Sequence, residues 1–204
     1  DRLLSRGLGD VYKRQGKVQV RSDLDAHFTQ FRIAVESAQF FGARYVRVFS
    51  FYHEGEEASA CREEVINFFH RMVDVAESAN VVLLHENESH IYGDVPTRCA
   101  DLLEVVSRPA LRAAFDPANF IQVGVDPLQD AWPLLKDCTD YFHIKDALAG
   151  SRAVVPAGYG DGSLEAILRD SVDSGFGGFL SLEPHLKAED LSLIHISEPT
   201  RQKP

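Results

Sequence analysis

Residues 81–116 read VVLLHENESHIYGDVPTRCADLLEVVSRPALRAAFD, and the order of residue types predicts one strand–helix–strand unit. Its ends, VVLLHE and LRAAFD, are short apolar runs of the kind that form buried strands. Between them, apolar residues recur at helical spacing over residues 96–106. Two buried strands joined by a helix predict parallel pairing in one sheet, with the helix packed on its face.

The same alternation continues upstream of this unit. Helical spacing over residues 25–42 ends at Gly42, a residue type that commonly closes a helix in the left-handed conformation. The β-branched and aromatic run YVRVFSF then predicts a strand from Tyr45. A second amphipathic helix follows over residues 65–76, and it precedes the strand VVLLHE.

Downstream, helix and strand signals alternate in the same way. A helix opens at Asp126 with Pro127 in its first turn, and the run YFHIK predicts the next strand. A last helix extends from Ser163, a good N-cap, to Gly175 and leads into the strand GFLSLEP. The pattern holds five strands and five helices without an internal linker, so it predicts one α/β domain.

Four of the five strands run straight into a metal-competent side chain. These residues are Glu86, Asp116, His143 and Glu183, each about one βα unit after the one before. In a TIM barrel the carboxyl ends of all strands converge on one face, so these side chains would meet there. Three carboxylates and one imidazole suit one divalent metal ion, Mn²⁺ or Mg²⁺, with Zn²⁺ or Co²⁺ as further candidates.

Each acidic residue also has a simpler interpretation, because an acid at a strand end is often the N-cap of the following helix. Four such residues at consecutive strand ends favour a shared metal site over unrelated caps. A doubly wound sheet would show the same alternation, and it would usually carry a glycine-rich phosphate loop after a strand. No predicted strand runs directly into such a loop, so we expect a TIM (β/α)8 barrel.

The segments LLHENE, FDPANF, YFHIKDA and LSLEPH resemble the metal-site motifs of the sugar phosphate isomerase and epimerase family, which shares its barrel with xylose isomerase and endonuclease IV. The resemblance extends over residues 16–190 and follows the order of the third to seventh strands of that barrel. It implies a truncated TIM barrel that lacks the first two strands and the eighth. It also implies that the four strand-end residues bind the metal, and that Glu86 and Glu183 act as catalytic acid and base.

Four further residues are candidates for contact with a substrate. Lys145 and His185 lie two positions after a proposed ligand, and alternate residues of a strand point the same way. Asn119 occupies a position where some relatives carry histidine, and His53 begins the loop after the first predicted strand. An ordinary surface or loop position is the alternative for Lys145, His185 and His53. His85 should point the opposite way, into the helix layer.

The loop VPAGYGDG, residues 155–162, resembles the glycine-rich loop of the same family. Its glycines are Gly158, Gly160 and Gly162. Such a cluster need only permit tight turns. The glycines alone therefore assign no function to the loop.

The two ends of the chain differ in character from its centre. Residues 1–15, DRLLSRGLGDVYKRQ, and residues 191–204, LSLIHISEPTRQKP, resemble translated read-through of sequencing adapters. The alternative is an ordinary basic first helix and an apolar last strand. We expect residues 16–190 to form the partial barrel, and we exclude the ends from the prediction of the fold.

Composition restricts the partners and the compartment. The chain of 204 residues has 31 acidic and 21 basic residues, a net charge of −10. So acidic a protein repels phosphate backbones, which argues against nucleic acid as a partner. Its three cysteines lack CxxC spacing and fit reduced thiols in the cytoplasm, and no apolar run approaches membrane-spanning length. The sequence is compatible with a full-length protein that forms a homo-oligomer.

The resemblance implies a metal-dependent isomerase or epimerase that moves a proton next to the carbonyl of a sugar or sugar phosphate. A dehydratase acting on a keto-inositol, a lyase, is the alternative on the same fold. A phosphodiesterase of the endonuclease IV kind would need more metal ligands and a basic groove, and a barrel that only binds a sugar would not need the ligands. The sugar or polyol itself stays undetermined, because specificity lies in the βα loops.

Overall fold

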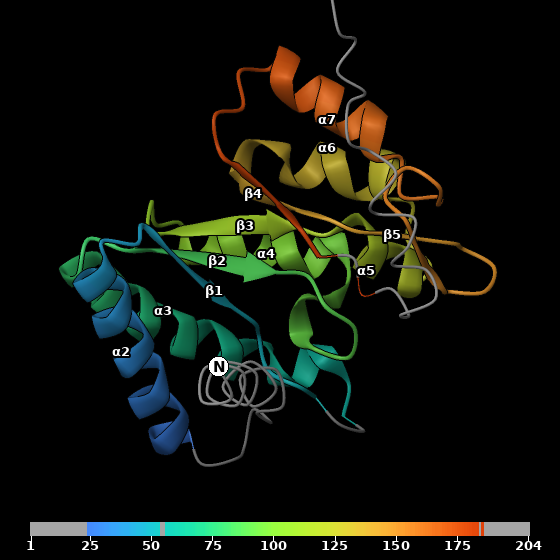
Figure 1. Ribbon diagram of the computed structural model, residues 1–204. Helices are drawn as coiled ribbons and strands as arrows, with labels where there is room; N and C mark the ends of the chain where they lie inside the picture. The colour runs from blue at the N-terminus through green and yellow to red at the C-terminus, as the bar shows by residue number, and fades with distance from the viewer. Residues whose placement is uncertain (1–23, 54–55, 184, 186–204) are drawn as a thin grey trace, which may run out of the picture.

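The computed structural model describes residues 24–53, 56–183 and 185, and its centre is a parallel sheet of five strands (Figure 1). The strands lie in the order β1-β2-β3-β4-β7, and every neighbouring pair is parallel. Their bounds are Tyr45–Val48 for β1, Val82–Glu86 for β2, Leu111–Phe115 for β3, Thr139–Ile144 for β4 and Phe179–Leu182 for β7. All five predicted strands are therefore present.

Helices connect the strands and pack against the outer side of the curved sheet (Figure 1). They are α2 (Leu24–Phe41), α3 (Arg62–Ser78), α4 (Pro96–Val106), α5 (Pro117–Gln122), α6 (Trp132–Leu135) and α7 (Leu164–Asp173), with shorter turns η1 (Ala58–Cys61), η2 (Tyr92–Asp94), η3 (Pro127–Ala131) and η4 (Lys136–Cys138). In α3 the residues at helical spacing are the buried ones, including Val65, Phe69 and Met72. The apolar stripe thus orients the helix on the sheet.

Alternate strand residues divide between the helix layer and the inner face of the sheet. Phe115 and Phe142 point outward, where both contact the ring of Trp132 from α6. Tyr45 of β1 and Phe179 of β7 point inward, and their ring centroids lie 5.8 Å apart although β1 and β7 are the two edge strands. The sheet therefore curls until its edges meet through inward side chains, as in a half-barrel.

Strand β1 is shorter than the sequence predicted, because it ends at Val48. Beyond it, the Gly93 N–H donates to Ser50 Oγ at 2.8 Å, and the Tyr92 N–H donates to the Phe51 carbonyl at 3.0 Å. These bonds lead the chain away from β2. Phe51 packs against His27 of α2 and Phe68 of α3, so its apolar side chain reflects packing against helices and not a longer strand.

The structure adds elements that the sequence did not predict. Helix α5 begins directly after β3, where Asp116 Oδ1 accepts a hydrogen bond from the Asn119 N–H at 3.0 Å. A two-stranded antiparallel hairpin joins β5 (Asp146–Ala147) to β6 (Val154–Val155). Both features are too short to show a period in the sequence.

The helix predicted from Asp126 is divided into the π-helical turn η3, α6 and η4. Asp126 caps it as expected, since Oδ1 accepts from the N–H groups of Leu128 and Gln129 at 2.9 and 3.0 Å. Pro133 supplies no N–H to the ladder, which favours a break there. Ser163 is the N-cap residue of α7, as predicted, but it has φ of 52° and its side chain makes no capping hydrogen bond.

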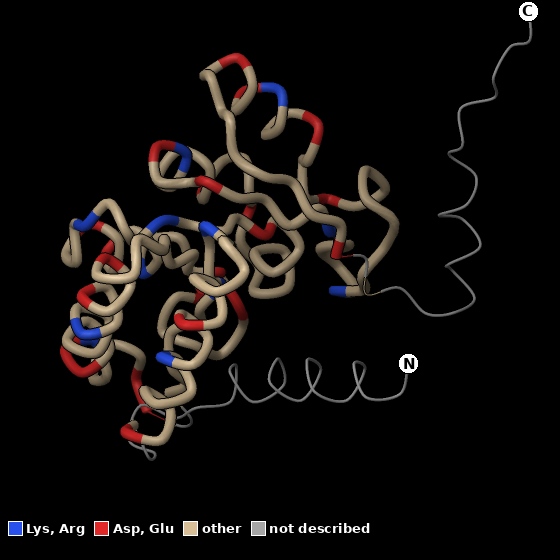
Figure 2. Tube along the Cα trace, turned by 60° about the vertical axis from the view of Figure 1, so that its left-hand side comes forward, with Lys and Arg blue, Asp and Glu red and all other residues tan. Residues whose placement is uncertain are grey.

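The predicted adapter segments, residues 1–15 and 191–204, lie outside the described residues. Within the described part, no helix has both the length and the apolar character needed to cross a membrane. Acidic positions are spread over the helices and loops of that part, with basic positions scattered among them (Figure 2).

Candidate metal centre

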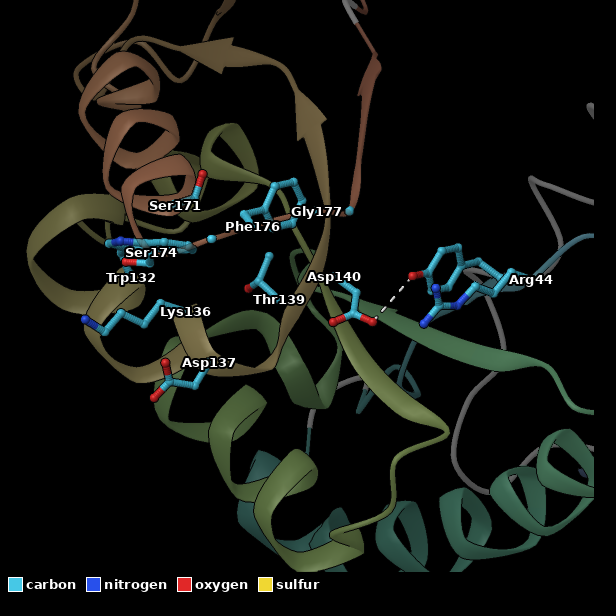
Figure 3. Close-up of a pocket in the computed structure, with 13 residues that line it drawn as sticks. Arg44, Trp132, Lys136, Asp137, Thr139, Asp140, Ser171, Ser174, Phe176 and Gly177 are labelled. Carbon is cyan, nitrogen blue, oxygen red and sulfur yellow. Dashed lines mark hydrogen bonds between the residues drawn. The ribbon is translucent and has the colours of Figure 1, made fainter.

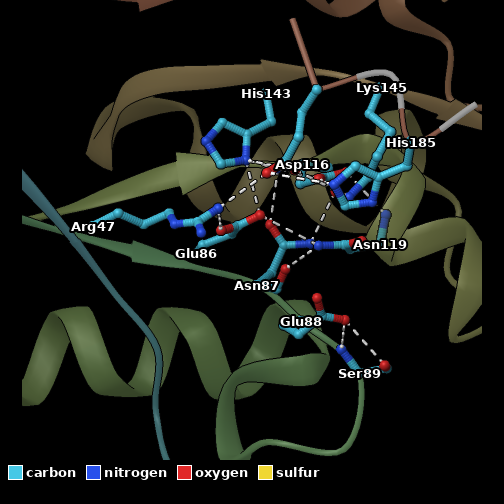
Figure 4. Close-up of polar contacts among 11 residues, drawn as sticks. Arg47, Glu86, Asn87, Glu88, Ser89, Asp116, Asn119, His143, Lys145 and His185 are labelled. Carbon is cyan, nitrogen blue, oxygen red and sulfur yellow. Dashed lines mark hydrogen bonds and ion pairs between the residues drawn. The ribbon is translucent and has the colours of Figure 1, made fainter. Parts of the chain in front are cut away.

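The four strand-end residues meet at one end of the sheet, and Figure 4 shows Glu86, Asp116 and His143 among them. Glu86 closes β2, Asp116 follows β3, His143 lies in β4, and Glu183 follows β7. Each offers a ligand atom, and these atoms all lie within 4.8 Å of one another. Glu86, Asp116 and His143 are buried and Glu183 is partly buried. Parallel register places the four side chains together, as the strand-end pattern predicted.

His143 lies at the centre of the carboxylates. Its Nδ1 is 2.8 Å from Glu86 Oε1, 3.4 Å from Glu183 Oε2 and 3.9 Å from Asp116 Oδ2. Three carboxylates at such distances repel one another, so the arrangement requires positive charge between them. Carboxylate oxygens with one imidazole are a donor set for a divalent cation.

Two basic side chains supply positive charge in this structure. Lys145 Nζ lies 2.7 Å from Asp116 Oδ2 and 3.3 Å from Glu183 Oε2. Arg47 Nη1 lies 2.7 Å from Glu86 Oε2 and 3.2 Å from Glu183 Oε1. Sequence reasoning missed Arg47, although a lone arginine inside an apolar strand is the signal that points to it.

Two asparagines, Asn87 and Asn119, hold the segments that carry Asp116 and Glu86 through hydrogen bonds. The Asn87 side chain makes two hydrogen bonds with the backbone of Asp116, one to its carbonyl and one from its N–H, each of 2.9 Å. Asn119 Nδ2 donates to the Asn87 carbonyl at 2.8 Å and lies 3.5 Å from Glu86 Oε1. The ends of β2 and β3 are thereby locked together. Asn87 was not predicted, because its partner lies on the neighbouring strand.

The protonation states respond to this crowding. Burial raises the pKa of Asp116 to about 7, although the charge of Lys145 opposes the rise. Burial would lower the pKa of His143, but its contacts with Glu183 and Glu86 outweigh burial and raise it to about 9. Burial would raise the pKa of Glu183, but His143 and Lys145 hold it well below its usual range. Protonated groups thus balance the carboxylates, as a bound cation would.

The surroundings of one oxygen, Asp116 Oδ2, are compatible with a cation ligand. Asp116 Oδ2 is buried and accepts no hydrogen bond of regular geometry from the described residues, although Lys145 Nζ is 2.7 Å away. Buried polar atoms in native proteins almost always have partners. An acceptor left incompletely satisfied inside a four-ligand cluster is what a metal site requires.

A family profile described as the xylose isomerase-like TIM barrel matches residues 21–198. The chain belongs to this family. Among curated proteins, none matches the sequence. The curled sheet and the cluster at its carboxyl end agree with the membership.

Solved structures share the fold of this xylose isomerase-like chain. A D-tagatose 3-epimerase-like protein has 16% identity and a TM-score of 0.72 over 88% of this chain and 71% of its own. The probable 3-DHS dehydratase AsbF of Bacillus anthracis has 16% identity and a TM-score of 0.72 over 89% and 74%. The IolI protein with a binding zinc atom has 18% identity and a TM-score of 0.69 over 85% and 66%. At these identities the likeness establishes the fold.

The barrel places the predicted substrate residues at different distances from the cluster. Lys145 and Asn119 contact its carboxylates, and the exposed His185 has its Nε2 3.8 Å from Glu183 Oε1 (Figure 4). His53 lies in the loop after β1, where its Nδ1 is 3.0 Å from the Glu56 carbonyl. His85 points into the helix layer as predicted, with its ring against Phe69 of α3 and its pKa lowered by burial to about 4.

Two cavities of this half-barrel both reach Tyr45 of β1 and differ in their other lining residues. One, of about 410 Å³, opens on the inner face and is lined by Arg47, His143 and Glu183. The other, of about 380 Å³, lies at the amino-terminal end of the strands, where Thr139 and Asp140 begin β4 (Figure 3). None of the four proposed ligands lines the second cavity. The first is therefore the candidate substrate cavity.

Proposed function

We propose that the chain carries the active site of a divalent-metal-dependent isomerase or epimerase that acts on a sugar or sugar phosphate. The observation that carries this proposal is the convergence of Glu86 and Glu183, from strands on different sides of the half-barrel, on His143 and Arg47. Two carboxylates that approach one site from different strands suit removal of a proton and its return. Epimerase-like and dehydratase relatives with the same fold support the class.

The metal is proposed to bind at Glu86, Asp116, His143 and Glu183, as Mn²⁺ or Mg²⁺, with Zn²⁺ or Co²⁺ as alternatives. A zinc atom in the related IolI structure supports a divalent ion. When bound, a divalent ion would polarise the substrate oxygens and make the neighbouring C–H bond more acidic.

The chain's own residues would divide the remaining work. Glu86 and Glu183 would take and return the proton, and Lys145 and Arg47 would hold these carboxylates while balancing negative charge that develops on the substrate. Further contacts with the substrate are proposed for Asn119, His185 and His53. The partner is a small sugar or polyol, the expected location is the cytoplasm, and a nucleic-acid role has no support in the acidic composition.

The extent of the domain is part of the proposal. We infer that residues 16–190 form a partial barrel, in which the sheet strands β1, β2, β3, β4 and β7 correspond to the third to seventh strands of the family's barrel. The relatives are longer, since the chain covers 71% and 74% of two of them. Residues 1–15 and 191–204 are proposed to be non-native adapter peptide.

Solvent exchange tests the reaction class. A metal-loaded preparation, incubated in D₂O with candidate ketoses, should introduce deuterium at the carbon next to the carbonyl, detected by NMR. The lyase alternative, favoured by the dehydratase relative, predicts loss of water and a conjugated product with new ultraviolet absorbance. Turnover without either signal would exclude the dehydration and any proton transfer in which the base exchanges its proton with solvent.

A further inference from the structure

Asp146 directly follows Lys145, is buried, and accepts four backbone hydrogen bonds. Its Oδ1 accepts from Ala147 and Gly162, both at 2.9 Å. Its Oδ2 accepts from Gly158 and Gly160, both at 3.0 Å. A carboxylate has about four acceptor positions, so all of them are filled.

The glycine-rich loop is shaped around this carboxylate. A Cβ atom on Gly160 would lie 2.4 Å from Asp146 Oδ1 and 2.6 Å from the Ala147 carbonyl oxygen, and one on Gly162 would lie 2.7 Å from the same Oδ1. Gly158 has φ of +85°, which favours glycine. Gly160 and Gly162 are therefore favoured by the close approach of the loop to Asp146, and Gly158 is favoured by its backbone conformation.

Backbone N–H groups that converge on one point form a nest, the device by which glycine-rich loops bind phosphate. We propose that residues 156–162 form an anion nest that Asp146 fills permanently, so that Asp146 positions the loop and the loop binds no substrate phosphate. The catalytic meaning of this proposal rests on the proposed function. A phosphorylated substrate, if used, would place its phosphate elsewhere.

The filled nest also joins two segments of the metal centre. Asp146 is the residue after Lys145, and a Cβ on Gly162 would lie 3.2 Å from Pro117 Cβ, the residue after Asp116. Lys145 and Asp116 are the partners of the 2.7 Å ion pair. The loop thus contacts the chain next to both partners, and Asp146 is a positioning residue for their pairing.

Removal of the Asp146 carboxylate tests this positioning role. In Asp146→Ala, hydrogen exchange measured by NMR should accelerate by about tenfold or more at the Gly158, Gly160 and Gly162 amides. Added formate, a small carboxylate, should restore their protection. Acylation of Lys145 by acetic anhydride, followed by mass spectrometry and normalised to the exposed Lys136, should rise in the variant and fall again with formate. A general loss of stability would not be reversed in this way.

Two further variants keep the test decisive if Asp146→Ala fails to fold. Asp146→Asn preserves the volume but replaces one acceptor oxygen by an NH₂ group, so two of the four amides should lose protection and two should keep it. Asp161→Asn is the matched control, because the exposed Asp161 accepts the Ala149 N–H at 2.8 Å from the same loop and should leave the glycine amides unchanged.

Two results would overturn the proposal: full protection of all four amides in Asp146→Asn, or a change in the wild-type glycine amides on addition of inorganic phosphate. These measurements use neither substrate nor metal. A failure of the proposed isomerase or epimerase activity would therefore leave them unaffected, and the two failures are distinguishable.

Discussion

Asp116 and Asp146 are two buried carboxylates just beyond the ends of neighbouring strands, with exposures of 0% and 1%. Asp146 has both oxygens saturated by four backbone N–H groups. In Asp116 only Oδ1 accepts a backbone hydrogen bond, from the Asn119 N–H. Its Oδ2 forms an ion pair with Lys145 but accepts no hydrogen bond of regular geometry. The comparison teaches that a saturated carboxylate holds structure, whereas an unsaturated one can bind a cation.

The largest expected effect is the loss of metal from Asp116→Ala or His143→Ala. Each removes a ligand, so Mn²⁺ affinity should fall by more than the roughly 10- to 100-fold typical of changes behind a ligand. Asp146→Asn should leave Mn²⁺ affinity within that smaller range. Titration calorimetry and elemental analysis after dialysis measure both. Unchanged metal content in the Asp116 and His143 variants would contradict the assignment.

The next effect concerns turnover. Glu183→Gln keeps an oxygen for the metal but cannot take up a proton, so turnover should fall by roughly 10²- to 10⁴-fold. Metal affinity should weaken less than turnover. Deuterium uptake from D₂O should fall together with activity, and a fully active Glu183→Gln enzyme would exclude Glu183 as acid or base.

A smaller effect, of opposite sign, is expected for Lys145→Met. Lys145 competes with a cation for Asp116 Oδ2, so its removal should tighten Mn²⁺ binding by roughly three- to tenfold, while the metal-free protein loses stability. Lys136→Met, at an exposed position, is the control and should change neither property. Weaker Mn²⁺ binding by Lys145→Met would mean that the lysine supports the metal site.

The smallest expected effects are on stability, and they distinguish an N-cap residue whose side chain makes capping hydrogen bonds from one whose side chain makes none. Asp126 accepts two backbone N–H groups, so Asp126→Ala should lower the free energy of unfolding by about 1 kcal/mol. Ser163 makes no capping bond, so Ser163→Ala should change it by less than about 0.5 kcal/mol. Chemical denaturation of the two variants measures both values, and equal losses would contradict the assignment of the caps.

Features that depend on residues close together in the sequence were predicted, and contacts between residues far apart in the sequence were missed. The bounds of α4 agree with the predicted residues 96–106, because a proline at its start and an apolar stripe are local signals. The ligands Glu86 and His143 were also visible, since each ends or nearly ends an apolar run. Arg47 was missed because its partner Glu183 lies 136 residues away, on the opposite edge strand.

The sequence by itself determined the alternation of strands and helices and the identity of the four strand-end side chains that the fold brings together. These depend on hydrophobic period and on residue type at strand ends. Only the tertiary structure decided which aspartate has its acceptor positions saturated by backbone N–H groups and which has an oxygen that a cation could contact. Asp116 and Asp146 look alike in the sequence, because each follows an apolar strand. Three of the four N–H groups that saturate Asp146, however, come from a loop 12 to 16 residues downstream. The folding of that loop onto β5 creates the difference, because a hydrogen bond depends on distance in space and not along the chain.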